Sequence, residues 1–349
     1  MTAATTLRTP NALAKAGLIP AERLEGLERV AARYAVAVTP AMSELIDAAN
    51  PGDPIARQFI PTPGELVAAP GERDDPIGDG PFSPVEGLIH RYPDRALLKL
   101  THSCAVYCRF CFRREVVGPA GGGTLSAAAL TAALAYVAAR PAIWEVILSG
   151  GDPLILSPRR LKAVMAALAA IDHVKVVRIH TRVPVVDPGA VTGELVDALA
   201  CEGKAVWVAL HANHARELTP AARAACARMV DAGLPMIGQT VLLAGVNDDP
   251  AVLSDLLRAM VETRIKPYYL HHGDLAPGTG TFRTPIARGQ ALMRSLRGDV
   301  SGLCQPTYVL DIPGGHGKVP VGPNYVTPCG EGGLSIEDPA GEAHPYPEP

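Results

Sequence analysis

Residues 101–114 read THSCAVYCRFCFRR and carry three of the seven cysteines of this 349-residue chain, Cys104, Cys108 and Cys111. Thiolates in a C-x3-C-x2-C array can converge on one soft metal centre, but the array supplies only three ligands. A closed zinc site would need a fourth protein ligand, and a disulfide would leave one thiol over. The count therefore fits an iron–sulfur cluster with one open iron, while spacing alone leaves zinc or a chance grouping open.

Composition and charge narrow the classes of function. Hydrophobic residues make up 48% of the chain and the formal net charge is −3, so the sequence predicts no nucleic-acid partner and favours a small charged metabolite. The N-terminus lacks an apolar core of signal-peptide length and no apolar run approaches about eighteen residues, which predicts a cytoplasmic protein without a membrane segment. A reducing compartment suits thiolates, and the sequence predicts Cys201, Cys226 and Cys304 to be buried free thiols.

Periodicity divides the chain into segments. Residues 1–88 lack strand alternation and carry short helical patterns near 20–34 and 40–49, which predicts a helical N-terminal extension followed by proline-rich turns. From Ala96 onward, apolar β-branched runs alternate with amphipathic segments, which predicts a parallel sheet with right-handed crossovers. The predicted strands are 96–101, 144–149, 174–180, 204–210, 236–242, 266–271 and a possible seventh at 307–311, with helices near 125–139, 159–171, 191–200, 219–232, 250–263 and 286–297.

Periodicity alone allows a doubly wound sheet or a barrel, and the polar motifs favour the barrel. The cysteine array follows the first predicted strand, SGGD at 149–152 the second, His180 the third, His211 the fourth and HHGD at 271–274 the sixth. Functional groups gathered at the carboxyl ends of strands are typical of barrel enzymes. We predict an α/β fold with a partial (β/α)6 TIM-like barrel at residues 89–305 and a separate C-terminal segment at 306–349.

Two glycine-rich motifs, taken alone, predict ordinary turns or loops without a function. Ser149, Gly150, Gly151 and Asp152 would usually form a plain turn, although paired glycines also let the backbone approach a ligand. The run DIPGGHGKVP at 311–320 looks like a phosphate-binding P-loop, but isoleucine stands at the first glycine position and valine where the hydroxyl is needed. Its lysine would by default face solvent.

Together these motifs resemble a known family. Phe110 directly before the third cysteine gives the C-x3-C-x-aromatic-C pattern of radical S-adenosylmethionine (SAM) enzymes. RYPDR at 91–95, SGGDPL, RIHTRVPVV, GVND, KPYYLHH, FRTP and DIPGGHGKVPVGPNYV are similar, in order, to lysine 2,3-aminomutases over about residues 85–326. The resemblance, to a short form of that family, implies a radical SAM barrel and an isomerase that interconverts L-lysine and β-lysine.

The resemblance implies three cofactors: a [4Fe-4S] cluster on the three cysteines, SAM, and pyridoxal phosphate (PLP). Lys318 matches the family lysine that carries PLP as a Schiff base, a role that a desolvated glycine-rich pocket favours by lowering a lysine pKa. The reduced cluster would split SAM to a 5′-deoxyadenosyl radical that takes hydrogen from the substrate β-carbon. Implied PLP contacts are Arg91, Tyr92, Arg95 and Gln239, and implied SAM contacts are Ser149, Gly150, Gly151 and Asp152, where many relatives have Glu.

Charge indicates the substrate. Lysine carries a carboxylate and a distal ammonium, so its site needs a fork-shaped cation at one end and carboxylates at the other. Arg113 matches the family arginine for the carboxylate, and Asp274 and Asp311 match the two acids for the ammonium. Two acids would repel the distal carboxylate of glutamate, so they favour a basic amino acid.

The chain departs from longer relatives at their zinc site. Asp249 stands where those relatives have a zinc-binding cysteine, and the tail has only Cys329, so zinc is not expected. Because that zinc helps to join subunits in the relatives, the assembly of the homo-oligomer that the resemblance implies is put in doubt. A flavodoxin or ferredoxin is the implied electron donor.

Three other functions stay open on the sequence. One is an aminomutase that supplies β-lysine for modification of elongation factor P, although this chain keeps the DIPGGHGK loop. Another is a 2,3-aminomutase for arginine or a further basic amino acid. The third, from a different class, is a noncatalytic iron–sulfur electron carrier or zinc-stabilised binding protein, for which replacing Lys318 would change nothing in ligand binding.

Overall fold

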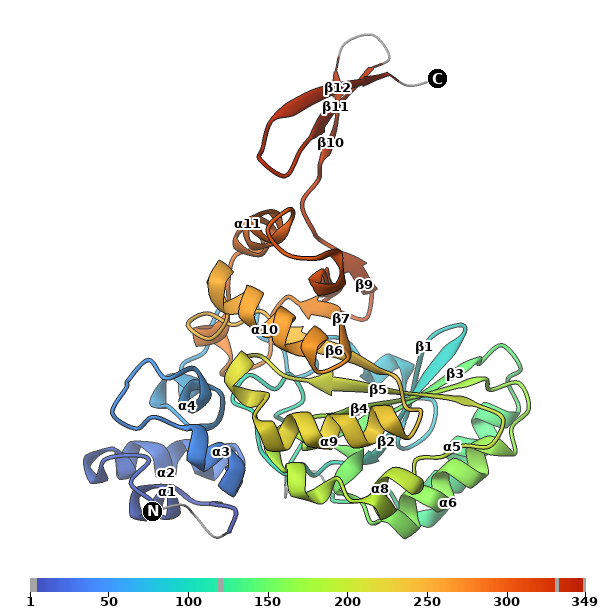
Figure 1. The fold of residues 1–349 in the computed structure, drawn as a ribbon. Coiled ribbons are helices and arrows are strands. Elements are labelled where there is room, and N and C mark those ends of the chain that lie inside the picture. Colours follow the sequence, from blue (N-terminus) through green and yellow to red (C-terminus); the bar gives the residue numbers. More distant parts are fainter. Residues whose placement is uncertain (1–4, 119–121, 330–332, 348–349) are drawn as a thin grey trace.

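Seven parallel strands, hydrogen-bonded in their order along the chain, form a curved sheet that is nearly closed into a barrel (Figure 1). The computed structural model describes residues 5–118, 122–329 and 333–347. The order of the strands in this sheet confirms the predicted partial barrel, including its seventh strand. The parallel strands are β2 (Arg95–Thr101), β3 (Glu145–Gly150), β4 (Val176–Thr181), β5 (Ala205–His211), β6 (Met236–Val241), β7 (Ile265–His271) and β8 (Thr307–Ile312).

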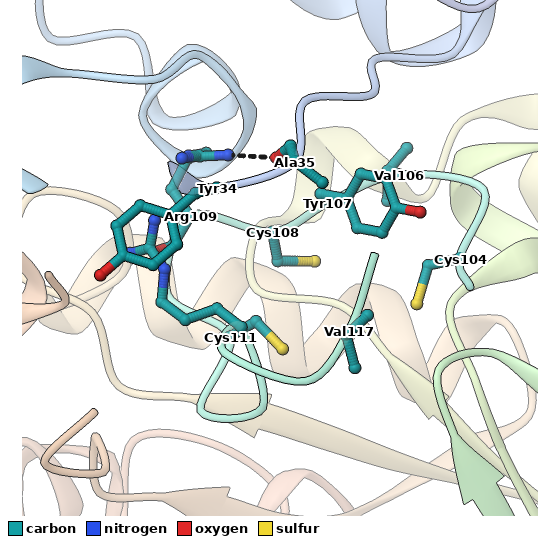
Figure 2. Close-up of a pocket in the computed structure, with 10 residues that line it drawn as sticks. Tyr34, Ala35, Cys104, Val106, Tyr107, Cys108, Arg109, Cys111 and Val117 are labelled. Carbon is teal, nitrogen blue, oxygen red and sulfur yellow. Dashed lines mark hydrogen bonds between the residues drawn. The ribbon is translucent and has the colours of Figure 1, made fainter. Parts of the chain in front are cut away.

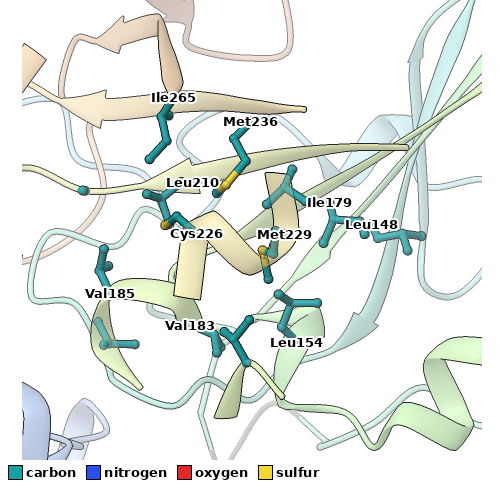
Figure 3. Close-up of a cluster of buried hydrophobic side chains, with 14 of the residues drawn as sticks. Leu148, Leu154, Ile179, Val183, Val185, Leu210, Cys226, Met229, Met236 and Ile265 are labelled. Atoms are coloured by element: carbon teal, nitrogen blue, oxygen red, sulfur yellow. The ribbon is translucent and has the colours of Figure 1, made fainter. Parts of the chain in front are cut away.

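Helices connect these strands and cover the outer face of the sheet (Figure 1). Ser126, Ser157 and Thr219 each cap the helix that follows, because each hydroxyl accepts a backbone N–H of the first turn. Leu210 and Met236 from the strands face Cys226 and Met229 of one helix in the buried core (Figure 3). The helices are α5 (Ala127–Ala138), α6 (Pro158–Ala169), α7 (Val183–Val186), α8 (Gly193–Asp197), α9 (Pro220–Asp231), α10 (Pro250–Glu262) and α11 (Ile286–Leu296).

Two antiparallel strands that the sequence did not predict flank the parallel sheet. β1 (Leu88–Tyr92) pairs with β2, so RYPDR spans a hairpin in which Tyr92 ends one strand and Arg95 begins the next. β9 (Gly317–Pro320) pairs with β8 and carries Lys318 opposite Asp311. The Lys318 backbone N–H donates to the Tyr92 Oη at 2.8 Å, so this hydrogen bond joins the two edges of the open barrel.

The N-terminal extension is helical, as predicted, and packs into the same hydrophobic core as the barrel. Leu27 and Phe59 are fully buried in that core with barrel residues such as Leu100. The extension also holds the cysteine loop, because the Arg109 N–H donates to the Gln58 carbonyl at 2.9 Å. Its helices are α1 (Pro10–Lys15), α2 (Leu24–Arg33), α3 (Pro40–Leu45) and α4 (Pro54–Phe59).

The C-terminal segment forms a small antiparallel sheet that projects away from the barrel (Figure 1). Its strands are β10 (Val326–Cys329), β11 (Gly333–Glu337) and β12 (Ala343–Pro347), and the outer two are exposed throughout. Sequence periodicity missed them because they lack a buried apolar face. The division of the chain at residues 88 and 305 stays a prediction. No described helix is both long and apolar enough to cross a membrane.

A buried cluster of three charges fixes the cysteine loop to the extension. Glu65 accepts hydrogen bonds from the guanidinium groups of Arg109 and Arg114, and the three side chains are only 1%, 2% and 4% exposed. Arg109 also donates to the Ala35 carbonyl at 2.8 Å, and Arg114 lies over the Tyr34 ring. A carboxylate between two buried cations is costly to remove, because both would lose their countercharge.

We therefore predict that Glu65→Gln destabilises the protein by about 3–5 kcal/mol, measured by urea unfolding. Glu262→Gln is the matched control, because it removes a carboxylate from the exposed pair with Arg223 and should cost less than about 1 kcal/mol. Equal destabilisation by the two variants would contradict the role given to Glu65.

Candidate active site

The three cysteines of the loop after β2 open onto one pocket. Cys104, Cys108 and Cys111 all line it, and Figure 2 shows their sulfur atoms directed toward a common space. All three are free thiols. In the described part of the chain, no further Cys, His, Asp or Glu lines this pocket. The donor set is thus three thiols without a protein group placed as a fourth ligand.

These thiols suit a cluster better than a single ion. Among the described residues, no three His, Cys, Asp or Glu side chains are grouped closely enough to hold one metal ion. In an iron–sulfur cluster each thiolate binds a different iron, so the sulfur atoms need not meet at one point. The residues present therefore fit a cluster with one iron left for an exchangeable ligand.

The SGGD motif at the end of β3 packs against the cysteine loop. A Cβ on Gly150 would lie 2.5 Å from the Thr101 carbonyl oxygen, and one on Gly151 would lie 2.2 Å from that of Ser103. Only glycine allows this approach. Both glycines and the buried Ser149 were predicted to contact SAM, which stays a prediction. The structure shows that the glycine pair also sets the position of the loop that carries the thiols.

Asp152, also predicted to contact SAM, has other partners in the structure. Its buried carboxylate accepts from the Thr181 hydroxyl at 2.8 Å, from the Arg182 N–H at 2.7 Å and from the Leu154 N–H at 3.0 Å. Burial raises the pKa of Asp152, while these hydrogen bonds oppose the shift. Asp152 therefore joins the end of β3 to the end of β4, and a contact with SAM would be additional.

Lys318 lies in a polar cluster at the other side of the site. Its ammonium donates to the Asp311 carboxylate on β8 and to His271 Nδ1 on β7, the latter at 3.2 Å. Because a lysine ammonium has no acceptor, His271 must accept at Nδ1 and is neutral. Burial and the Lys318 charge hold the pKa of His271 well below its usual value, which agrees with that assignment.

Asp274 follows β7 and faces the same cluster. Burial, reinforced by the negative charge of Asp311, raises the pKa of Asp274 to about 7, while Lys318 and Arg113 oppose the rise. The structure therefore brings both predicted acids and the predicted lysine together. A second cation arriving here would favour the ionised form of Asp274.

Asp79 links the two sides of the site and was missed by sequence reasoning. It accepts from Arg91 at 2.9 Å and from Arg113 at 3.1 Å, so one carboxylate holds two of the three guanidinium groups that were predicted to bind PLP or the substrate. Arg113 lies two residues beyond Cys111, and Arg91 precedes Tyr92, which contacts Lys318. Asp79 lies in the proline-rich segment that the sequence predicts to form turns. Its partners are 12 and 34 residues away in the chain, so no local sequence motif indicates its role.

Two half-buried histidines, His180 and His211, lie at the carboxyl ends of the neighbouring strands β4 and β5. Burial holds the pKa of His180 well below its usual value and, with the Arg182 charge, lowers that of His211 to about 3. His211 stacks on Phe110 with ring centroids 5.6 Å apart, beside the third cysteine. Gln239, a predicted PLP contact on β6, lies 3.4 Å from His180 Nε2. These neutral rings line the interior between the thiols and the lysine.

The remaining predicted residues are placed as follows. Arg95 lies over the Tyr92 ring at 3.8 Å and pairs with Asp94, so its contact with PLP stays a prediction. Asp249 caps α10 by accepting from the N–H groups of Ala251 and Val252, and Cys329 is exposed on β10. Cys201, Cys226 and Cys304 are buried free thiols, as predicted.

Comparison with known proteins agrees with this site. Residues 98–257 match the radical SAM superfamily and residues 293–349 match the lysine-2,3-aminomutase model. The chain is 42% identical over 328 residues to the L-lysine 2,3-aminomutase of Acetoanaerobium sticklandii, covering 94% of this chain and 79% of that protein. The L-lysine 2,3-aminomutase of Clostridium subterminale is 41% identical over 328 residues (94% and 78%), and the glutamate 2,3-aminomutase of Clostridioides difficile is 35% identical over 306 residues (88% and 72%). With three thiols at one pocket, a lysine paired with an acid on the other side of the site, and these matches over most of its length, the chain belongs to the lysine 2,3-aminomutase family of radical SAM enzymes.

Proposed function

We propose that this protein is a lysine 2,3-aminomutase, which interconverts L-lysine and β-lysine. The observation that carries the proposal is that Asp311 pairs with Lys318, while Asp274 is close enough to Asp311, Lys318 and Arg113 for their charges to shift its pKa. Two carboxylates at one end and a guanidinium at the other match an amino acid with a distal ammonium. The relatives that are about 40% identical to this chain bear the name L-lysine 2,3-aminomutase.

The residues present would hold three cofactors. Cys104, Cys108 and Cys111 would bind a [4Fe-4S] cluster, the SGGD backbone would hold SAM at its open iron, and Lys318 would carry PLP. When bound, the cluster and SAM supply a carbon radical and PLP supplies an electron-delocalising support for the migrating nitrogen. The chain must position these groups and keep water away.

The charged side chains orient the substrate. Arg113 would receive the α-carboxylate as a fork-shaped donor, which fixes the backbone end of the amino acid. Asp274 and Asp311 would receive the distal ammonium. Because Asp311 is paired with the Lys318 ammonium in this structure, joining Lys318 to PLP would release Asp311 for the substrate cation.

Lys318 must lose a proton before its amine can react with a carbonyl. Nδ1 of His271 and the Asp311 carboxylate are the two groups in contact with Lys318 Nζ. Asp311 pairs with the Lys318 ammonium, and His271, whose pKa is held well below its usual value by burial and by the Lys318 charge, is a weak base that accepts a hydrogen bond at Nδ1. We assign His271 the role of orienting the Lys318 side chain through this hydrogen bond.

Apolar side chains screen the cluster side of the site. Cys108 packs against a small apolar core that is separate from the main one. This core consists of Phe110, Leu243, Val246 and Phe282. Such a wall limits water next to the thiols and strengthens the electrostatic contacts inside.

We propose further that the protein works in the cytoplasm as a homo-oligomer and takes electrons from a flavodoxin or ferredoxin. Seven free cysteines support a reducing compartment. A cluster with an open iron needs a one-electron donor to start the reaction.

The direct test is anaerobic incubation of reconstituted protein with SAM, PLP, dithionite and single amino acids, followed by mass spectrometry of β-amino products. We expect β-lysine from L-lysine and no product from L-glutamate. Product from arginine but not from lysine would overturn the substrate assignment, and a lack of product from every amino acid would overturn the function.

Two variants test the assigned roles in the same assay. Lys318→Ala should abolish product while iron content is kept, because the cluster ligands are untouched. Asp274→Asn should lower kcat/KM for lysine at least about thirtyfold, since a charged partner of the ammonium is lost. Full activity of either variant would contradict its role.

Lysine binding should weaken as pH falls through 7. The pKa of Asp274 is about 7, so its ionised fraction drops about tenfold between about pH 8 and pH 6, while the substrate ammonium stays charged. The measurement is the ratio of lysine to norleucine affinity, by calorimetry with PLP-loaded protein, because norleucine lacks the distal charge. A ratio that stays flat over this range would count against Asp274 as an ammonium partner.

Gly78→Ala should lower PLP affinity by at least about tenfold relative to Gly71→Ala. Both glycines have positive φ (+67° and +80°), so the backbone strain is matched. A Cβ on Gly78 would lie 2.4 Å from the backbone N of Gly315 in the loop before Lys318, whereas one on Gly71 meets only the Leu275 side chain at 3.4 Å. PLP titration by absorbance measures the difference, and equal affinities would show that the loop contact does not shape the cofactor site.

A further inference from the structure

We propose that Arg182 tunes the reduction potential of the iron–sulfur cluster through its hydrogen bond to the Cys108 sulfur. The inference rests on the proposed function, because it requires the cluster on Cys104, Cys108 and Cys111. Arg182 follows β4 and belongs to no part of the substrate or PLP site described above.

The geometry places a positive charge directly on one cluster ligand. Arg182 Nη1 lies 2.8 Å from Cys108 Sγ, and the arginine side chain is only 7% exposed. In this setting water cannot screen the charge. Cys108 is thus a thiol with a fixed cationic donor at its sulfur.

Both terminal nitrogens of the guanidinium are held by hydrogen bonds, while its buried Nε has no hydrogen-bond partner among the described residues. Its Nη2 donates to Gln58 Oε1 at 2.6 Å and to Glu217 Oε2 at 2.7 Å. Its plane lies near the rings of Phe59 and Phe110, at 4.6 and 5.5 Å from their centroids. The Arg182 backbone N–H is bound to Asp152, so the residue cannot turn away from the sulfur without breaking several contacts.

Glu217 is the countercharge to consider. Its carboxylate also accepts from Gln58 Nε2 at 3.1 Å and from the N–H groups of Asn213 and His214 at 2.9 and 3.0 Å. These donors partly neutralise the negative charge of Glu217. Arg182, and not Glu217, makes the hydrogen bond to Cys108. The group that meets the sulfur is therefore positive, while Glu217 weakens its effect.

The electrostatics fix the sign of the effect. One electron enters the cluster from an external one-electron donor, and the cluster with its three thiolates becomes more negative by one charge. Hydrogen bonds to sulfur and nearby positive charge stabilise the more negative state and raise the reduction potential. Removing Arg182 should thus lower the potential, and removing Glu217 should raise it.

The test compares Glu217→Gln with the double variant Arg182→Gln/Glu217→Gln, so that no uncompensated carboxylate is buried in either protein. The readout is the midpoint potential of the reconstituted cluster by EPR-monitored titration without SAM or amino acid, with iron and sulfide measured per chain. We expect the double variant to have a midpoint potential at least about 59 mV below that of Glu217→Gln. For a one-electron couple, this shift corresponds to at least a tenfold lower ratio of reduced to oxidised cluster at a fixed potential. We expect Glu217→Gln to lie above the wild type.

Equal midpoints in the two variants, with full iron content, would overturn the proposal. Loss of the cluster from the double variant while Glu217→Gln keeps it would also overturn it, since Arg182 would then serve assembly. Arg182→Lys, which keeps the charge, should lie between the wild type and the double variant. A wild-type protein that binds no iron and sulfide would contradict the proposed function instead.

Discussion

The carboxylate of Asp79 joins the two halves of the site, and the rest of the arrangement depends on it. Through Arg113 it is tied to the cysteine loop, and through Arg91 to the strand whose tyrosine meets the Lys318 backbone. Arginine forks hold a carboxylate in a defined direction, so this bridge sets both the spacing and the orientation of the two sides. Radical chemistry requires such control, because a radical made on one side must meet its target on the other.

The site carries a balanced set of charges that ligands would exchange. Arg91, Arg113 and Lys318 are positive, and Asp79, Asp274 and Asp311 are negative, so these six side chains sum to a charge of zero when all are ionised. Anionic cofactor and substrate groups would share the guanidinium partners of Asp79, and the substrate ammonium would replace the lysine on Asp311. Each ligand thus finds a charge that the protein has already desolvated, which lowers the cost of binding.

Much of this fold could be read from the sequence, and the failures have physical causes. Buried parallel strands such as Val176–Thr181 are recognisable in the sequence as runs of apolar, β-branched residues. The predicted bounds of the barrel strands and of most helices between them are therefore close to the observed bounds. β9 was missed because it is short, follows two glycines and begins with a third, and β10 to β12 were missed because they lack a buried face. The thiols and Lys318 lie in local motifs, whereas Glu65 and Asp79 act on partners distant in sequence and leave no pattern. Arg182 lies in the RIHTRVPVV motif, but nothing in that run indicates its contact with Cys108.

The central claim is that a radical generated beside the three thiols reaches a substrate held at Lys318. The most direct measurement is mass spectrometry of 5′-deoxyadenosine after reaction with lysine deuterated at its β-carbon. Deuterium in the 5′-deoxyadenosine of the wild type, and its loss in Lys318→Ala, is the predicted result. Cleavage of SAM that leaves the wild-type 5′-deoxyadenosine without deuterium would contradict the account.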